Sequence, residues 1–251
     1  MNVVITGITS GLGEALVSQF KKDINLKIIG IYKDKKKLKF SSSKNLVLIK
    51  CDFSKKSHVY TLVKKIKKYK TIDCLINNHA VLGGYKHTSK ELFYINYLSI
   101  QELTFKLLKN LYKSKKKLVV NISSHAHNID LSKKKLTEMS NWQTYKLSKL
   151  CLIVLSKKLT TIGLNSISIN PGRMRTNFGK DNFFKIIIKL YLFIFGKDPN
   201  SIAKKIYKII NSKKYRNGCY YSNFKIKKMH HGLNNYKQIL KFLNFDNKIN
   251  V

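Results

Sequence analysis

Short apolar runs alternate with longer amphipathic stretches along the whole chain. The runs that predict buried strands span 3–5, 26–32, 46–50, 72–76, 118–124, 167–170 and 217–221. Helices are predicted over 14–20, 55–68, 89–111, from residue 145 onward, after 198 and over 235–245. No internal repeat is visible. Strand and helix in regular alternation predict one α/β domain over residues 1–251, a doubly wound parallel sheet with helices on both faces.

A glycine-rich turn separates the first strand from the first helix. Residues 6–13 read Thr-Gly-Ile-Thr-Ser-Gly-Leu-Gly. A helix N-terminus offers free backbone N–H groups and partial positive charge, and glycine lets the backbone approach a ligand closely. This arrangement predicts a site for a nucleotide diphosphate, although three glycines in a loop also occur without any ligand.

A tyrosine and a lysine four residues apart form the strongest candidate for chemistry. Tyr145 and Lys149 share one face of a predicted helix. A free phenol titrates near ~10, and a neighbouring ammonium favours the phenolate; lowering that pKa by ~3 takes ~4 kcal/mol. Such a pair also arises by chance in a lysine-rich chain with 14 tyrosines. The motifs before and after this pair are what favour a catalytic role for it.

Taken together, the motifs resemble those of the short-chain dehydrogenase/reductase family. They are G-x-x-x-G-x-G at 7–13, Asn77-Asn78-His79-Ala80, the serine pair 123–124, Tyr145-x-x-x-Lys149, and the Pro-Gly-x-x-x-Thr run at 171–176. The Ser-Ser-x-Ala-His run at 123–127 resembles the retinol-dehydrogenase-like branch. The resemblance covers nearly the whole chain. It implies a Rossmann-type fold and hydride transfer between NADP(H) and a carbonyl or alcohol.

The resemblance also implies a role for each candidate catalytic residue. Tyr145 is expected to be the general acid/base. Lys149 is expected to lower the pKa of Tyr145 and to hold the nicotinamide ribose. Ser124, rather than Ser123, is expected to bond the substrate oxygen. Asn96 is expected to support a proton relay.

The expected cofactor contacts follow from the same motifs. They are Gly7, Thr9, Ser10, Gly11, Leu12, Gly13, Lys33, Asp52, Phe53, Asn78, Tyr145, Lys149, Pro171, Gly172, Met174 and Thr176. Lys33 ends the second strand, where a basic residue favours NADP over NAD; in so lysine-rich a chain it is also explained by composition. Asp52 is expected at the adenine, although it could simply cap a helix. His79 departs from the smaller residue usual beside the adenosine.

An apolar stretch follows the last of these motifs. Residues 183–195 carry Lys185 and Lys189 one turn apart among aromatic and aliphatic side chains. By resemblance, residues 178–198 form a flap over the substrate, which predicts a lipophilic substrate and leaves open a peripheral membrane contact. A core helix packed on the sheet explains the same pattern. Thirteen residues are too few to span a bilayer, which takes ~20.

Composition changes the picture in one respect. Lysine and arginine number 50 against 12 acidic residues, a net charge of +38, so a polyanion-binding protein is an alternative. Because the basic residues are almost all lysines spread along the chain, we expect no specific nucleic-acid site. A cofactor-binding protein without chemistry, acting as a regulatory or scaffold module, is a second alternative.

The remaining expectations concern location, metals and assembly. The four cysteines are far apart, which predicts free thiols in a reducing compartment. With the first predicted strand starting at Val3, we expect no cleavable leader and a cytoplasmic protein. His125 and His127 form an H-x-H pair without a third ligand of suitable spacing, so no metal is expected. The sequence leaves open whether the protein forms a homo-oligomer.

Overall fold

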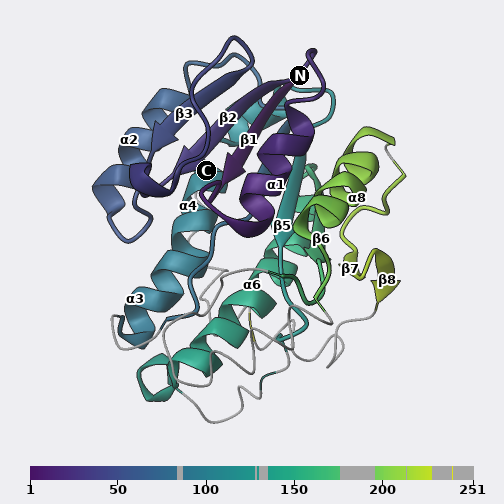
Figure 1. Ribbon diagram of the computed structural model, residues 1–251. Helices are drawn as coiled ribbons and strands as arrows, with labels where there is room; N and C mark the ends of the chain where they lie inside the picture. Colours follow the sequence, from purple (N-terminus) through teal and green to yellow (C-terminus); the bar gives the residue numbers. More distant parts are fainter. Residues whose placement is uncertain are drawn as a thin grey trace.

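One mixed sheet organises the chain. The computed structural model describes residues 1–83, 87–127, 129, 135–175, 196–212, 214–227 and 239. Its strands are β1 Asn2–Thr6, β2 Lys27–Tyr32, β3 Leu46–Lys50, β4 Cys74–Asn77, β5 Leu118–Ile122, β6 Asn165–Asn170, β7 Tyr220–Ser222 and β8 Lys225–Lys227. They lie in the order β3-β2-β1-β4-β5-β6-β7-β8 (Figure 1). All neighbours are parallel except β7 and β8.

Helices cover both faces of this sheet. They are α1 Gly11–Phe20, α2 Lys56–Ile66, α3 Ser89–Phe93, α4 Ser99–Lys106, α5 Leu108–Tyr112, α6 Asn141–Thr161 and α8 Pro199–Ser212, with a π-helical turn at Tyr94–Leu98. One apolar cluster joins α1 and α8 to the sheet, and the other joins α2, α4 and α6 to the opposite face. The predicted doubly wound, Rossmann-type α/β fold is confirmed.

The alternating side chains of the strands supply both clusters. Val3 and Ile5 of β1 pack in the cluster with α1 and α8, whereas Val4 packs in the cluster with α2 and α6. All three side chains are fully buried. A strand covered on both faces has to be apolar at every position, which is why these runs stood out in the sequence.

Two predicted helices differ from the structure. The stretch predicted as one helix over 89–111 is divided, because the N–H of Ser99 donates to the carbonyl of Tyr94 and creates the π-helical turn. The first helix begins at Gly11 rather than at residue 14, so two glycines lie inside its first turn. A hydrophobic pattern gives no signal at glycine positions, so it misses a helix start that contains two glycines. It is also hardly changed by the single extra residue of a π-helical turn, so it does not reveal that turn.

Three further differences concern the later part of the chain. The helix expected to open with Tyr145 begins at Asn141, where Ser140 and Gln143 form a capping box. The short antiparallel strand β8 was not predicted. The predicted helix over 235–245 lies outside the described residues, apart from residue 239, and so does the apolar stretch 183–195.

A buried polar network ties the central strands together. The Asn77 amide donates to Asn121 Oδ1 (2.8 Å), and the Asn121 amide donates to Ser156 Oγ (2.8 Å). Ser156 and Ser168 share a hydroxyl–hydroxyl bond of 2.7 Å. These four residues come from β4, β5, α6 and β6. The network therefore fixes the strands whose ends carry the candidate site.

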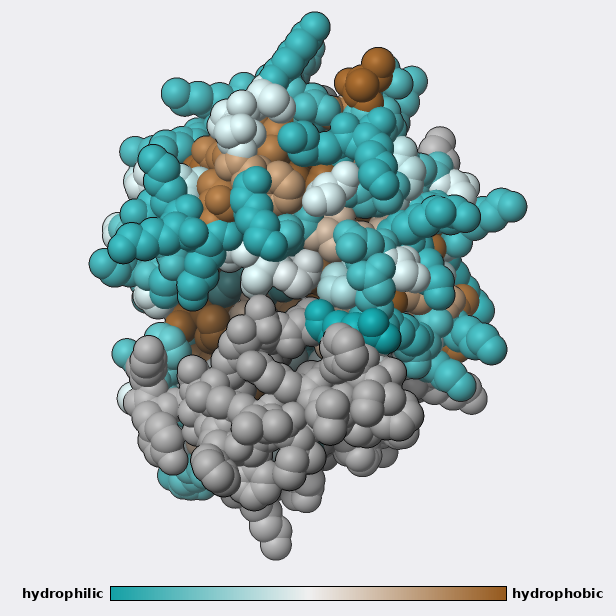
Figure 2. Space-filling model, viewed as in Figure 1, coloured by the Kyte–Doolittle hydropathy of each residue, from teal (hydrophilic) through white to brown (hydrophobic). Residues whose placement is uncertain are grey.

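Hydrophilic side chains dominate the described part of the face in Figure 2. The basic runs at 35–37 and 64–65 are exposed, on a 3₁₀ turn and on α2. Among the described residues, the structure holds no helix of the length and apolarity needed to cross a membrane.

Candidate active site

The candidate site lies along the carboxyl edge of the sheet. The glycine turn follows β1, the Asn77-Asn78 pair ends β4, the serine pair follows β5, and the Pro171-Gly172 turn follows β6. β1 and β4 are neighbours, while the chain runs from β1 outward through β2 and β3 before returning to β4. Ligands of open α/β sheets bind at such a reversal of strand order.

The glycine turn is too tight for any other residue at two positions. Gly7 has φ +71°, and a Cβ on it would lie 2.8 Å from the Cα of His79. A Cβ on Gly13 would lie 1.9 Å from the carbonyl oxygen of Gly7. The Asn78 amide holds the turn from the other side, donating to the carbonyls of Thr6 (2.9 Å) and Gly7 (3.0 Å). A side chain at either position would therefore push the turn away from the chain that packs against it.

The first turn of α1 fits a diphosphate. Ser10 precedes the helix in an extended conformation and makes no side-chain capping bond to it. The backbone N–H groups of Gly11, Leu12 and Gly13 lack intrahelical partners by their position. With no acidic cap in front of them, these groups would hold the phosphates of a nicotinamide dinucleotide.

Ser124, Tyr145 and Lys149 come together where β5 ends against α6. The side chains of Ser124 and Tyr145 are hydrogen-bonded. The ammonium of Lys149 lies 5.6 Å from the centre of the Tyr145 ring and donates to the carbonyl of Ile122 (2.9 Å). Tyr145 is 8% exposed and Lys149 3% exposed. A hydroxyl, a phenol and an ammonium in this order can pass a proton to or from a bound oxygen.

Burial dominates the protonation of this group. It raises the pKa of Tyr145 to about 12, with the hydrogen bond to Ser124 acting in the lowering direction. It also lowers the pKa of Lys149 to about 8. In the protein without a cofactor, the hydrogen bond with Ser124 is the influence that lowers the pKa of Tyr145. The lowering expected from Lys149 therefore stays a prediction for the complex.

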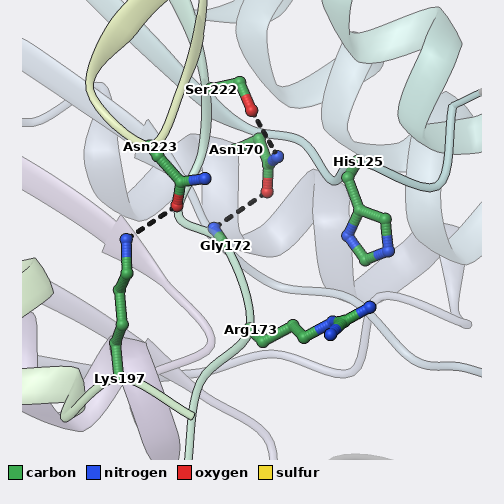
Figure 3. A pocket seen from close by; sticks show the side chains of 7 residues that line it. All are labelled: His125, Asn170, Gly172, Arg173, Lys197, Ser222 and Asn223. Atoms are coloured by element: carbon green, nitrogen blue, oxygen red, sulfur yellow. Dashed lines mark hydrogen bonds between the residues drawn. The ribbon is translucent and has the colours of Figure 1, made fainter. Parts of the chain in front are cut away.

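The turn after β6 lies next to the start of α8. Asn170 is buried, and its side chain accepts from the N–H of Gly172 (2.9 Å) and donates to Ser222 (3.0 Å). Met174 and Lys197 form a parallel bridge. Beside the turn, a cavity of about 350 Å³ is lined by His125, Asn170, Gly172, Arg173, Lys197, Ser222 and Asn223 (Figure 3). The described positions 171–175 thus sit at the carboxyl edge, and Thr176 lies outside the described residues.

Known proteins match this architecture. The family model for short chain dehydrogenases matches residues 1–184. The chain belongs to the short-chain dehydrogenase family. The retinol dehydrogenase 13 of Mus musculus is 28% identical over 166 residues, which cover 56% of this chain and 48% of that protein. The chain thus spans about half the length of this curated relative, whose name agrees with the branch suggested by the serine–histidine run.

Solved structures share the fold. A short-chain dehydrogenase/reductase from Saccharomyces cerevisiae has a TM-score of 0.72 and 23% identity, covering 89% of this chain and 96% of that chain. An NADPH-bound carbonyl reductase from chicken fatty liver has a TM-score of 0.69 and 18% identity, covering 91% and 98%. A 3-alpha-hydroxysteroid dehydrogenase from Pseudomonas sp. B-0831, complexed with NADH, has a TM-score of 0.69 and 17% identity, covering 88% and 94%.

The two serines of the family motif make different contacts. Ser124 contacts Tyr145 and accepts from the N–H of Ala126 (3.1 Å). Ser123 donates instead to the carbonyl of Lys149 (2.8 Å) and is buried. Ser124 thus lies against the phenol and Ser123 against the helix backbone, and the contact of Ser124 with a substrate oxygen stays a prediction.

Asn96 lies in the π-helical turn. Its side chain is fully buried and makes two bonds to Val81, accepting from the N–H (2.8 Å) and donating to the carbonyl (2.7 Å). Its amide is thus occupied by the loop after β4, whereas its proton-relay role stays a prediction. π-helical turns are frequent at functional sites.

His79, which departs from the family pattern, is accommodated by this same turn. Ser99 N–H donates to Tyr94, so the carbonyl of Ile95 lacks its usual helical partner. His79 Nε2 lies 2.8 Å from that carbonyl, and Ser99 Oγ donates to it at 2.9 Å. Burial lowers the pKa of His79 to about 4, so the imidazole is neutral and Nε2 carries the proton. The size of His79 is evident from the sequence, whereas its contact with Ile95 is not.

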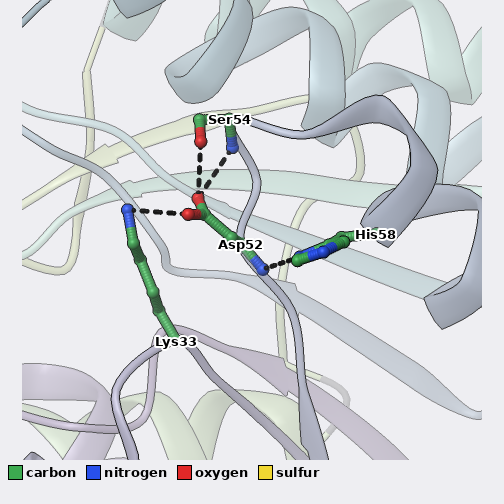
Figure 4. A network of polar contacts seen from close by, with 4 residues as sticks. All are labelled: Lys33, Asp52, Ser54 and His58. Carbon is green, nitrogen blue, oxygen red and sulfur yellow. Dashed lines mark hydrogen bonds and ion pairs between the residues drawn. The ribbon is translucent and has the colours of Figure 1, made fainter.

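The residues expected at the adenine end also contact one another. The rings of Phe53 and His79 stack with centroids 4.3 Å apart and planes inclined by 16°. Asp52 binds Lys33 (3.1 Å) and accepts from the N–H and hydroxyl of Ser54 (Figure 4). Partial burial raises the pKa of Asp52, but the bonds from Ser54 and Lys33 outweigh it and hold the pKa below its ordinary value.

Most of the predicted site residues therefore lie along one edge of the sheet, and their roles stay predictions. Thr9 and Ser10 lie in the glycine turn before α1, and Pro171 and Met174 lie in the turn after β6. Besides the contact of His79, sequence reasoning missed Trp142, whose ring stacks on Tyr145. Two features of the sequence could have indicated Trp142: it is the sole tryptophan, and it precedes Tyr145 by about one helical turn.

Proposed function

We propose that the protein is an NAD(P)-dependent oxidoreductase that interconverts a carbonyl and an alcohol. The observation that carries this proposal is the hydrogen-bonded Ser124–Tyr145 pair with the Lys149 ammonium beside the phenol ring. The glycine turn supports it, because it excludes side chains where a dinucleotide would bind.

When bound, a nicotinamide cofactor would provide the hydride needed for carbonyl reduction. Tyr145 donates its phenolic proton to the carbonyl oxygen, and in the reverse direction it removes the proton from the alcohol. Ser124 bonds the same oxygen and steadies its developing charge. Lys149 would stabilise the resulting phenolate through its positive charge and would contact the cofactor ribose.

We also propose a preference for NADP(H) over NAD(H). Lys33 follows β2 directly, and its side chain is 61% exposed despite its ion pair with Asp52. An exposed ammonium there can bind the 2′-phosphate that distinguishes NADP from NAD. Asp52 would contact the adenine through the carboxylate that now binds Lys33.

The substrate class is proposed from the sequence alone. Residues 183–195, which motivated a lipophilic substrate, lie outside the described residues. If they cover the substrate, kcat/KM across a series of straight-chain aldehydes should rise about tenfold for every two added methylenes, from ~0.8 kcal/mol per methylene. A flat series would show that these residues do not contact the substrate.

We propose a cytoplasmic location on the chemistry of the cysteines. All four are free thiols, and Cys51, Cys74 and Cys151 are buried. Burial raises the pKa of each of these three thiols, which makes them unreactive. Free thiols are typical of a reducing compartment.

The replacement Tyr145→Phe tests the proposed reaction. Phenylalanine keeps the ring but has no proton to transfer, so NADPH-dependent turnover of a panel of aldehydes and ketones should fall by ~10²–10⁴-fold. The dissociation constant of NADPH, measured by fluorescence titration, should stay within about threefold of wild type. Tyr60→Phe on the exposed face of α2 is the control. Turnover by Tyr145→Phe above about a tenth of wild type would refute the assignment.

A further inference from the structure

The only tryptophan of the chain lies beside the candidate active site. Trp142 is the second residue of α6, and it is 52% exposed. Trp142, Tyr145 and Lys149 follow one another at spacings of three and four residues, so they share one face of the helix. Trp142 therefore occupies the outer end of the face that carries the proposed acid/base.

Trp142 and Tyr145 are in direct ring contact. Their ring centroids are 5.6 Å apart and their planes are inclined by 13°, an offset stack. The Lys149 ammonium lies at the same 5.6 Å from the Tyr145 ring centre. The phenol is almost buried, whereas the indole is half exposed. The two rings thus lie in nearly parallel planes, with the exposed indole on the solvent side of the buried phenol.

A purely structural explanation of Trp142 is that the stack stabilises the start of α6. The capping box of Ser140 and Gln143 already does this, through bonds in both directions. A tryptophan selected for packing alone would bury most of its surface, because that burial is the source of its stabilisation. Half of this indole is instead left to solvent next to the site of the reaction.

We propose that Trp142 is a specificity-determining residue, the aromatic wall of the substrate site, and that it selects carbonyl compounds with a planar conjugated group next to the carbonyl. This inference rests on the proposed function, because it places the substrate oxygen at Tyr145 and Ser124. A substrate whose carbonyl oxygen binds there extends its adjoining carbon skeleton past the Tyr145 ring. A flat, conjugated skeleton can stack on the indole, whereas a puckered saturated ring cannot.

A matched pair of aldehydes tests the proposal. Benzaldehyde and cyclohexanecarbaldehyde are similar in size, but only the first is planar and aromatic. In Trp142→Ala, the ratio of kcat/KM for benzaldehyde to that for cyclohexanecarbaldehyde should fall about two- to tenfold, which corresponds to ~0.5–1.5 kcal/mol of stacking. The loss should lie mainly in KM. Comparing this ratio between variants cancels the different intrinsic reactivities of the two aldehydes.

Two further variants complete this experiment. Trp142→Phe keeps an aromatic ring and should retain most of the wild-type ratio. Tyr60→Ala removes an aromatic side chain that is also 52% exposed, but on α2, and should leave the ratio unchanged. An unchanged ratio in Trp142→Ala, or an equal loss in Trp142→Phe, would overturn the proposal.

The fluorescence of Trp142 gives a second readout that does not need turnover. As the sole tryptophan, it alone supplies the indole emission of the protein. Benzaldehyde added to the NADPH complex of Tyr145→Phe should quench this emission saturably, and cyclohexanecarbaldehyde should quench it weakly or not at all. Quenching that rises linearly with the concentration of both compounds would overturn the proposal that Trp142 forms a wall of the substrate site. If benzaldehyde quenches the emission saturably but the wild-type enzyme reduces no carbonyl compound, the role of Trp142 in binding stands and the proposed reaction is rejected.

Discussion

Replacing Lys149 by methionine should stabilise the folded protein at neutral pH while it abolishes turnover. Lys149 is 3% exposed, and its ammonium has one described hydrogen bond, to the carbonyl of Ile122. Burial lowers its pKa from the ordinary value of 10.5 to about 8. At pH 7 the protein therefore holds a buried charge that the unfolded chain solvates better.

The size of the effect follows from the pKa. Each pKa unit corresponds to ~1.4 kcal/mol, so holding the ammonium costs ~3 kcal/mol of folding free energy at pH 7. Methionine has a similar length and no charge, but it leaves the Ile122 carbonyl without that donor, which costs ~1–2 kcal/mol. The free energy of unfolding of Lys149→Met should thus exceed that of wild type by ~1–2 kcal/mol at pH 7.

The pH dependence identifies the cause. Because the pKa of Lys149 is lower in the folded state, the unfolded chain binds more protons between pH 8 and 10.5, and the stability of wild type gains from this residue as pH rises through that window. Lys149→Met lacks this gain. The advantage of the variant should shrink by ~3 kcal/mol across the window and change sign near the middle of it.

Urea denaturation at a series of pH values between 7 and 10.5 measures this difference. Lys65→Met, at an exposed position of α2, is the control and should follow wild type at every pH. A constant difference between Lys149→Met and wild type across the series would refute the argument, and so would a less stable variant at pH 7. Charge at this site would then be tolerated without cost.

Two further predictions concern the cofactor. Wild type should bind NADPH more tightly than NADH, and Lys33→Asp should reverse this preference. Lys36→Asp, on the neighbouring 3₁₀ turn, is the control and should not reverse it. Equal dissociation constants of wild type for the two cofactors would contradict the prediction. Gly13→Ala should weaken NADPH binding at least tenfold, because its Cβ would meet the Gly7 carbonyl oxygen at 1.9 Å. Gly163→Ala, with φ +81° but nothing within 4 Å of its Cβ, should cost ~1–2 kcal/mol of stability and leave binding unchanged.

The amino-acid sequence alone predicted where the strands lie along the chain, except for β8, and it supplied the candidate site residues. Strands buried on both faces have to be apolar throughout, so runs such as 3–5 and 118–122 are visible without a structure. The spacing of Tyr145 and Lys149 likewise places them on one helix face in any α-helix. These properties are local, since they depend on residue type and on helical or strand periodicity.

Only the tertiary structure decided what those residues contact. Ser124 follows β5 and Tyr145 lies on α6, so their hydrogen bond depends on how the helix packs on the sheet. The contact of His79 with Ile95 requires the π-helical turn, which a hydrophobic pattern does not reveal. The lowered pKa of Lys149 arises from burial by distant segments. Such contacts depend on neighbours in space, which no local pattern of residues specifies.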